Sequence, residues 1–111
     1  MKETKETTKA KKAPRTRSGK YVIVRTYTAG CFAGNLESRD GQEVTLTYAR
    51  RLWYWAGAAS LSQLATTGTS QPNNCKFPAE VVRIILPQAI EIIDVLPIAQ
   101  ASIAAVAPWE V

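Results

Sequence analysis

From Lys20 onward, apolar and polar residues alternate along the chain as β-strands require. The first three such segments are rich in β-branched and aromatic residues, which favours strands over helices. They cover residues 21–28, 31–38 and 43–48. Arg39-Asp40-Gly41, between the second and third segments, is typical of a tight hairpin turn because glycine supplies the positive φ that such turns need. The pattern therefore predicts a meander of three antiparallel strands.

Two breaks interrupt this alternation. Gly34 lies in the middle of the second strand, which indicates a bulge or a close approach of another backbone. Ala49-Arg50-Arg51 interrupts the third strand, and the alternation resumes over residues 52–55. A bulge near Ala49, or a corner in the sheet, would explain the second break.

Two short helices are predicted. Ser60 is placed to cap a helix over residues 61–65, with Gln63 at the capping-box position and Gly68 just past the end. Pro97 suits the first position of a second helix that runs to about Ala105. We expect the apolar face of this second helix to comprise Ile98, Ala101 and Ala105, with Ser102 opposite.

Residues 81–86 and 90–95 predict two further strands, separated by Pro87-Gln88. Both are apolar at nearly every position, so we expect both faces to be covered, one by the meander or helices and the other by a partner chain. Their few charged residues are expected to pair across the two strands; these are Arg83, Glu91 and Asp94. Trp109 is expected to pack back on the sheet.

These elements predict an α+β fold: an antiparallel sheet of five or six strands with an N-terminal meander and two short helices, forming a small sandwich- or barrel-like domain. The domain is expected to span residues 20–111. Residues 1–19 contain no large apolar residue after Met1 and are expected to form a disordered basic arm.

The net charge of +5 is distributed unevenly along the 111 residues. Residues 1–20 hold eight Lys and Arg and two Glu (8 − 2 = +6), whereas residues 21–111 hold six Lys and Arg and seven Asp and Glu (6 − 7 = −1). A broad phosphate-binding face on the folded part is therefore not expected. The arm is interpreted either as a contact to nucleic acid or a partner, or as a solubilising tail; its basic residues are Lys9, Lys11, Lys12, Arg15 and Arg17.

The sequence contains no histidine, which removes the commonest general base and the commonest transition-metal ligand. Cys31 and Cys75 alone cannot build a zinc site, and we expect two free thiols, with one long-range disulfide as the alternative. The carboxylates fall mostly in turns or on exposed strand faces, and the glycines form no phosphate-binding loop. We therefore expect no enzyme activity, no metal and no cofactor.

No apolar run approaches the roughly 20 residues of a membrane helix, and the N-terminus lacks the apolar core of a signal peptide. We expect a protein that is not secreted by a signal peptide and does not enter membranes.

Aromatic and arginine residues gather between residues 48 and 55, and these, with two residues of the first strand, form the candidate binding site. In one interpretation a tryptophan stacks on a base or ring while an arginine binds a phosphate. In the other, the tryptophans pack beneath the first helix and the arginines lie at the rim. The candidate residues are Arg25, Tyr27, Arg50, Arg51, Trp53 and Trp55.

Four blocks of the sequence resemble a small domain of unknown function that recurs in tailed-phage and prophage genomes. They are YVIVRTYTAGCFAG (21–34), ARRLWYWAGAASLSQLA (49–65), GTSQPNNCKFP (68–78) and AIEIIDV (89–95). The resemblance covers nearly all of residues 20–110 and implies a phage origin, but it transfers no catalytic residue. Leu96, Ile98 and Ile103 are more apolar than in the family, which favours an extra contact with another chain.

These observations predict a non-enzymatic phage accessory protein. The hypothesis we favour is a virion-associated structural protein (a decoration, adaptor or internal protein) that self-associates or binds other phage structural proteins, located in the virion or in the host cytoplasm during infection. One alternative is an early protein that binds a host factor or sequesters a nucleotide. Another is a nucleic-acid-binding protein that acts through its arm.

Overall fold

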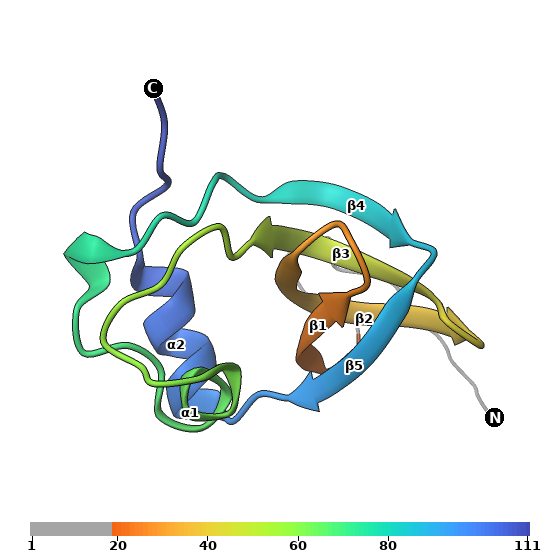
Figure 1. The fold of residues 1–111 in the computed structure, drawn as a ribbon, viewed down its shortest axis with the longest axis horizontal. Helices are drawn as coiled ribbons and strands as arrows, with labels where there is room; N and C mark the ends of the chain where they lie inside the picture. Colours follow the sequence, from red (N-terminus) through yellow and green to blue (C-terminus); the bar gives the residue numbers. More distant parts are fainter. Residues whose placement is uncertain (1–18) are drawn as a thin grey trace, which may run out of the picture.

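The computed structural model describes residues 19–111, which form one antiparallel sheet with a helical layer beside it (Figure 1). The elements follow the order β1 (Tyr21–Thr26), β2 (Cys31–Asp40), β3 (Glu43–Arg51), α1 (Leu61–Thr67), a 3₁₀ turn η1 (Pro72–Asn74), β4 (Val81–Leu86), β5 (Ala89–Asp94) and α2 (Pro97–Ala105). The strand order is β4-β3-β2-β1-β5. The predicted α+β class and the meander are confirmed. The sheet has five strands, since the segment at 52–55 contributes only an isolated bridge between Tyr54 and Lys76.

The sheet curls without closing, and β4 and β5 are its two edges. Although only Pro87 and Gln88 separate them in sequence, β5 leaves β4 at once: the Ala89 amide donates to the Gln42 carbonyl at 2.9 Å, and β5 then pairs with β1. The prediction that the charged residues of these strands pair with one another is therefore wrong. Arg83 pairs with Glu37 (3.2 Å), Glu91 with Arg25 (2.9 Å) and Asp94 with Lys20 (3.1 Å).

The predicted irregularities at Gly34 and Ala49 are confirmed as one and the same bulge, and a second register shift between β2 and β3 follows between Leu36 and Ser38. Ala33 lies opposite Arg50 and Asn35 opposite Thr47, so Gly34 faces two residues of β3. One of these, Tyr48, has a φ of 50°. A Cβ on Gly34 would lie 3.0 Å from the Cα of Ala49, so the close approach of the two backbones requires glycine here.

Two apolar clusters stabilise the fold, one on each face of the sheet. The cluster inside the curl contains Val22, Val24, Phe32, Val44, Leu46, Ala49, Leu86 and Ala89. The cluster between the outer face and the helical layer contains Tyr21, Ile23, Ala33, Leu52, Leu64, Ala65, Cys75, Phe77, Ile103 and Val106. Strand β1 contributes alternate residues to both, which explains why its first four residues are all buried.

Helix α1 begins and ends as its sequence predicts. The Gln63 amide donates to Ser60 Oγ at 3.2 Å, and Gln63 Oε1 accepts from the Ala59 amide at 2.8 Å, which together satisfy donors at the helix start. At the other end Gly68 has a φ of 79°, and its amide donates to the Leu64 carbonyl. A side chain at Gly68 would collide with Ser102 of α2, so this glycine also sets the helix–helix distance.

Helix α2 has the predicted bounds but buries a different face from the one expected. Ala99 and Ile103 are buried, with Val106 just beyond the helix, whereas Ile98, Ala101 and Ala105 are exposed. Ser102 lies toward the protein interior, where its Oγ accepts from the Thr69 amide at 3.0 Å. The weak amphipathicity of this helix misled the prediction, because alanine and serine fit either environment.

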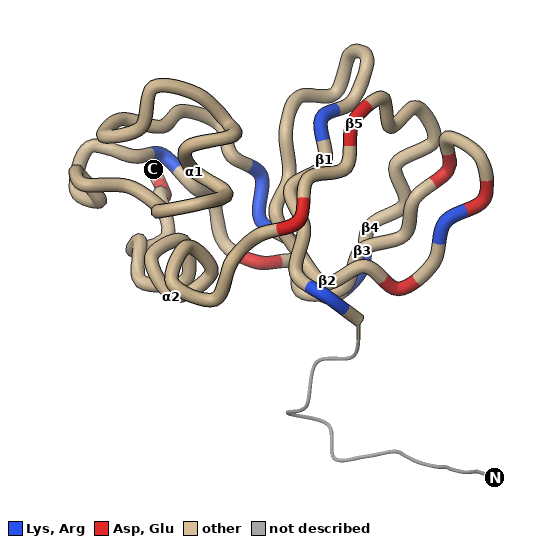
Figure 2. The backbone as a smooth tube through the Cα atoms, turned by 90° about the horizontal axis from the view of Figure 1, so that it is seen from below, with Lys and Arg blue, Asp and Glu red and all other residues tan. Residues whose placement is uncertain are grey.

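The charges lie on the sheet and its hairpins, whereas the helical layer is almost free of them (Figure 2). Residues 52–75 and 95–109 contain no charged side chain. None of the helices in residues 19–111 is long and apolar enough to cross a membrane.

Candidate functional site

Arg50, a predicted ligand-binding residue, lies inside the fold between the sheet and the helical layer. Its side chain is 4% exposed, and its guanidinium donates to the carbonyl oxygens of Phe77 (2.8 Å), Ile103 (2.9 Å) and Pro78 (3.1 Å). Burial lowers the pKa of this guanidinium, while the neighbouring Tyr21 and Glu80 side chains act to raise it. In this arrangement Arg50 joins the end of β3 to two distant segments and is closed to a ligand.

The other two arginines of the predicted site are also held by the fold. Arg51 donates from Nη1 to the Ala29 carbonyl at 2.6 Å, and its guanidinium carbon lies 4.5 Å from the centre of the Phe32 ring. Arg25 donates from Nε to Glu91 Oε1 at 2.9 Å on the open face of β1. Tyr27 lies in the following turn with its ring exposed.

Trp53 and Trp55 are not neighbours on one surface. Trp53 is 62% exposed, whereas Trp55 packs against the cluster between the sheet and the helices. Residues two apart in a strand face the same side, so this division shows that residues 52–55 do not continue as a regular strand; only Tyr54 forms a bridge, to Lys76. One tryptophan therefore lies on the surface and the other packs against the core.

A second aromatic cluster, which the sequence did not predict, consists of Tyr54, Lys76 and Trp109. The Lys76 ammonium is 6.0 Å from the centre of the Tyr54 ring and 5.5 Å from that of Trp109. The Trp109 amide donates to the Phe77 carbonyl at 2.9 Å, which fixes the C-terminal segment beside the bridge. The expectation that Trp109 packs on the sheet is wrong: it lies against Lys76, half-exposed.

The segment GTSQPNNCKFP forms part of the helical layer. Cys75 Sγ accepts from the Ala56 amide at 3.4 Å, and Thr69 Oγ1 donates to the Ala56 carbonyl while accepting from the Gln71 amide. Both cysteines are free thiols. Burial raises the pKa of the half-buried Cys31 thiol; Arg25 acts to lower it and Glu91 to raise it.

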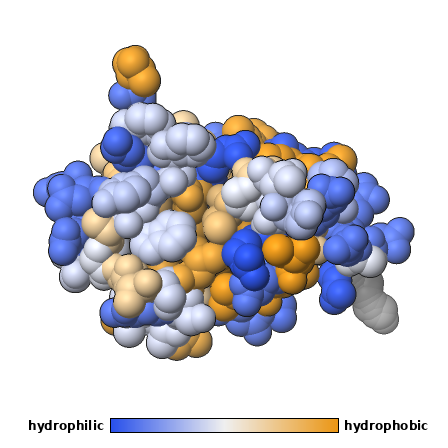
Figure 3. Space-filling view, viewed as in Figure 1, coloured by the Kyte–Doolittle hydropathy of each residue, from blue (hydrophilic) through white to orange (hydrophobic). Residues whose placement is uncertain are grey.

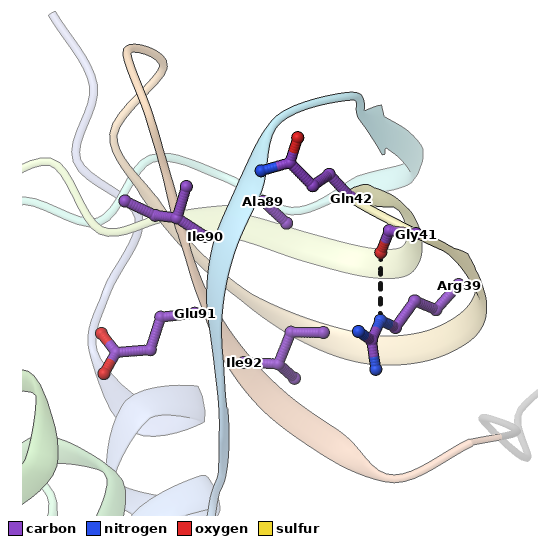
Figure 4. Close-up of a pocket in the computed structure, with 7 residues that line it drawn as sticks. All are labelled: Arg39, Gly41, Gln42, Ala89, Ile90, Glu91 and Ile92. Carbon is purple, nitrogen blue, oxygen red and sulfur yellow. Dashed lines mark hydrogen bonds between the residues drawn. The ribbon is translucent and has the colours of Figure 1, made fainter.

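An open cleft of about 650 Å³ lies between β5 and the β2–β3 hairpin (Figure 4). Ile92 points into it from β5, toward the Arg39 guanidinium, whose Nε donates to the Gly41 carbonyl at 3.1 Å. Glu91 points away to its partner Arg25. The cleft can accept a small apolar group carrying a negative charge. Its lining comes from segments about fifty residues apart in the sequence, so no local motif predicts the cleft.

The largest unpartnered feature is the free edge of β4. Val81, Val82 and Ile85 are exposed there, and Figure 3 shows apolar residues along the upper edge of the molecule, where β4 runs. The strand has β3 as its one strand neighbour. An edge strand leaves a row of backbone N–H and C=O groups unpaired, and natural sheets normally protect it with charges, proline or a covering element.

The predicted arm residues, Lys9 to Arg17, lie outside the described residues. Within residues 19–111, no group of three or more His, Cys, Asp or Glu side chains is placed to hold a metal ion.

The described residues thus define a small α+β domain with an open sheet and an exposed apolar edge. The profile of DUF6948, a domain of unknown function, matches residues 19–103, and the chain belongs to that family. The match begins at Gly19, whose carbonyl accepts from Asn35 Nδ2. Comparisons with curated proteins and with solved structures find no match.

Proposed function

We propose that this protein is a non-enzymatic structural protein of tailed phages that acts by binding other protein chains, including copies of itself. The free edge of β4 carries the proposal, because it is an exposed apolar strand that no other element of residues 19–111 covers, and such a strand is a surface for strand addition. Only Arg83 breaks its apolar run, and this guanidinium is already paired with Glu37. A partner strand would therefore meet mainly hydrocarbon and backbone groups.

Three further observations support a binding role over an enzymatic one. The chain has no histidine, and the resemblance to a phage domain transfers no catalytic residue. The helical layer carries no charge over residues 52–75 and 95–109. A surface without charged side chains suits protein contact better than contact with a phosphate backbone.

Mass spectrometry of purified particles, from a phage that encodes this chain, tests the proposal. Tens to hundreds of copies per particle are expected, and absence from particles would overturn the structural role. A Val82→Lys chain, supplied in trans, should be depleted from particles. Ile98→Lys places the charge on α2, the other surface that the sequence associates with a contact to another chain, and should be incorporated normally because β4 is the proposed contact. Val82 is 72% exposed on β4 and Ile98 is 68% exposed on α2, so the two substitutions place the same charge at equally open apolar positions.

A second function, nucleic-acid binding, is favoured by the +6 balance of residues 1–20. If the arm carries it, deleting residues 1–18 abolishes binding to single- and double-stranded DNA, whereas Val82→Lys leaves it unchanged. Binding that survives the deletion would overturn this role for the arm. Nucleotide sequestration by the Arg/Trp cluster has less support, because Arg50 and Trp55 belong to the interior.

A further inference from the structure

The two edges of the sheet differ in how they are protected. Strand β5 carries two charged residues, Glu91 and Asp94, which are ion-paired as Arg83 is, and charged side chains on an edge oppose the addition of another strand. Strand β4 carries one charged residue, Arg83, in the sequence VVRIIL. The apolar face toward the curl comprises Val82, Ile84 and Leu86, of which only Leu86 is buried. An incoming strand is therefore expected at β4 and not at β5.

A second copy of β4 suits this edge better than an unrelated strand. Residues 19–111 hold seven Lys and Arg and seven Asp and Glu (7 − 7 = 0), so the folded domains of two copies carry no net charge that would keep them apart. Most soluble oligomers are formed by identical chains with closed symmetry, and a twofold axis turns one free edge toward another. Antiparallel pairing of two β4 strands satisfies both rows of backbone groups at once.

Symmetry restricts the register of such a pair. Directly opposite residues of an antiparallel ladder lie on the same face of the sheet. A twofold axis perpendicular to the sheet runs between the two strands, so one residue of β4 must lie directly opposite the same residue of the second copy. We name each axis by that residue. An axis at Arg83 aligns residues 81–85 of the two strands, and an axis at Ile84 aligns residues 82–86, so each pairs five of the six residues of β4. Axes at Val82 or Ile85 pair only three.

Charge decides between the two longer registers. An axis at Arg83 would set two guanidinium groups directly opposite each other, which destabilises a cross-strand pair. An axis at Ile84 instead places Arg83 opposite Ile85 of the second copy and leaves each arginine with its Glu37 partner. It also sets Val82 opposite Leu86 of the second copy, on the face that continues the cluster inside the curl.

We propose that β4 pairs antiparallel with β4 of a second copy about a twofold axis at Ile84, which joins two five-stranded sheets into one of ten strands. This inference rests on the proposed self-association and names its surface and register. The pairing covers Val82 and Ile85 and satisfies the free backbone groups of both edges. It leaves α2, and with it Ile98, away from the contact.

Light scattering on the full-length chain, over a dilution series, tests the partner. A dimer is expected, with Val82→Lys raising its dissociation constant roughly 100-fold because two apolar side chains lose their burial. Ile98→Lys should leave the dissociation constant unchanged. Urea unfolding of each variant separates loss of association from loss of folding.

Cysteine cross-linking tests the register. Under mild oxidation, Ile84→Cys should form a disulfide-linked dimer, identified by peptide mapping, because only a residue on the axis meets its own copy. In this register the Cβ atoms of two Arg83→Cys residues lie diagonally, about 7–8 Å apart, and a disulfide needs roughly 3.5–4.5 Å. Cross-linking by Arg83→Cys and not by Ile84→Cys would overturn the register.

The outcomes separate this inference from the proposed function. A chain that stays monomeric at every concentration overturns the second-copy proposal. If Val82→Lys is nevertheless excluded from particles, the structural role stands and the edge binds a different chain. A dimer that neither Val82→Lys nor the cross-links disturb uses another surface, which overturns the assignment to β4 but not self-association.

Discussion

The Arg50 guanidinium donates to the carbonyl oxygen of Ile103 across 53 positions of the chain, at 2.9 Å. The same group holds the Phe77 and Pro78 carbonyls, so one side chain of β3 fixes both the end of α2 and the segment that leads into β4. The Phe77 and Ile103 carbonyls also accept from the Trp109 and Val106 amides, so the guanidinium is their second donor.

Replacing Arg50 by methionine should destabilise the protein by about 3 kcal/mol, since three enclosed carbonyl groups each lose one donor. The stability of Arg50→Lys should lie between that of the unchanged protein and that of Arg50→Met, because an ammonium cannot reproduce the forked geometry of a guanidinium. Urea unfolding measures the difference. Arg39→Met is the control: Arg39 is exposed and should change stability by less than about 0.5 kcal/mol. Equal effects at both positions would contradict the role of Arg50.

Gly57→Ala should be far more damaging than Gly41→Ala, although both glycines have positive φ (80° and 61°). A Cβ on Gly57 would lie 2.5 Å from the Gln71 amide nitrogen, whereas a Cβ on Gly41 meets nothing within 4 Å. Gly41→Ala should cost about 1–2 kcal/mol from its backbone conformation alone. Gly57→Ala adds an overpacking penalty of about 1–3 kcal/mol. Thermal unfolding of the two variants tests the ranking.

The Cys31 thiol should react slowly with iodoacetamide near pH 8.5, because burial raises its pKa and depletes the thiolate. Glu91→Gln should speed the reaction and Arg25→Gln should slow it, since the carboxylate raises this pKa and the guanidinium lowers it. Peptide-level alkylation rates, compared with the urea-unfolded chain, measure the effect. Equal rates in the folded and unfolded chains would contradict it.

The same shift fixes a pH dependence of stability. The folded state holds the Cys31 proton more tightly than the unfolded chain does. The contribution of this thiol to the free energy of unfolding is therefore fully present below the unfolded pKa of about 8.5. It falls as the pH rises above that value. Urea unfolding between pH 7 and 10 should therefore show a loss of stability that is smaller in Cys31→Ala.

The Arg25–Glu91 pair should contribute little to stability despite its 2.9 Å contact, since both side chains are about half exposed. A double-mutant cycle with alanine should give a coupling energy below about 1 kcal/mol. Adding 1 M NaCl should reduce the coupling further through screening. A coupling that is large and independent of salt would show that the pair is shielded from solvent.

Local sequence signals located most elements because each depends on residues close in the chain. The alternation in 21–48, the capping residues Ser60 and Gln63, and Pro97 all act within a few positions. Gly34 predicted the bulge because a glycine within a strand often marks a close approach of another backbone, here that of Ala49. The expected ion pairs between β4 and β5 failed because the partner of each strand is chosen by the path of the whole sheet.

The candidate sites depended on tertiary structure to a greater degree. Arg50 and Arg51 are adjacent in sequence, yet one lies inside the fold and the other in a turn contact, because successive side chains of a strand point to opposite faces. Lys76 meets Tyr54 and Trp109 only because a bridge and the C-terminal segment bring them together. The spacing of these three residues in the sequence does not predict that they are in contact.

The sequence by itself determined the α+β class, the meander, the caps of α1 and the separation of a basic N-terminal segment from a nearly neutral domain. Only the tertiary structure decided that β5 returns to β1, that Arg50 is an internal link, and that β4 is the edge left open. The physical reason is the range of the interactions. Turn, cap and strand preferences act between neighbours, whereas burial and edge exposure depend on every element that packs around a residue.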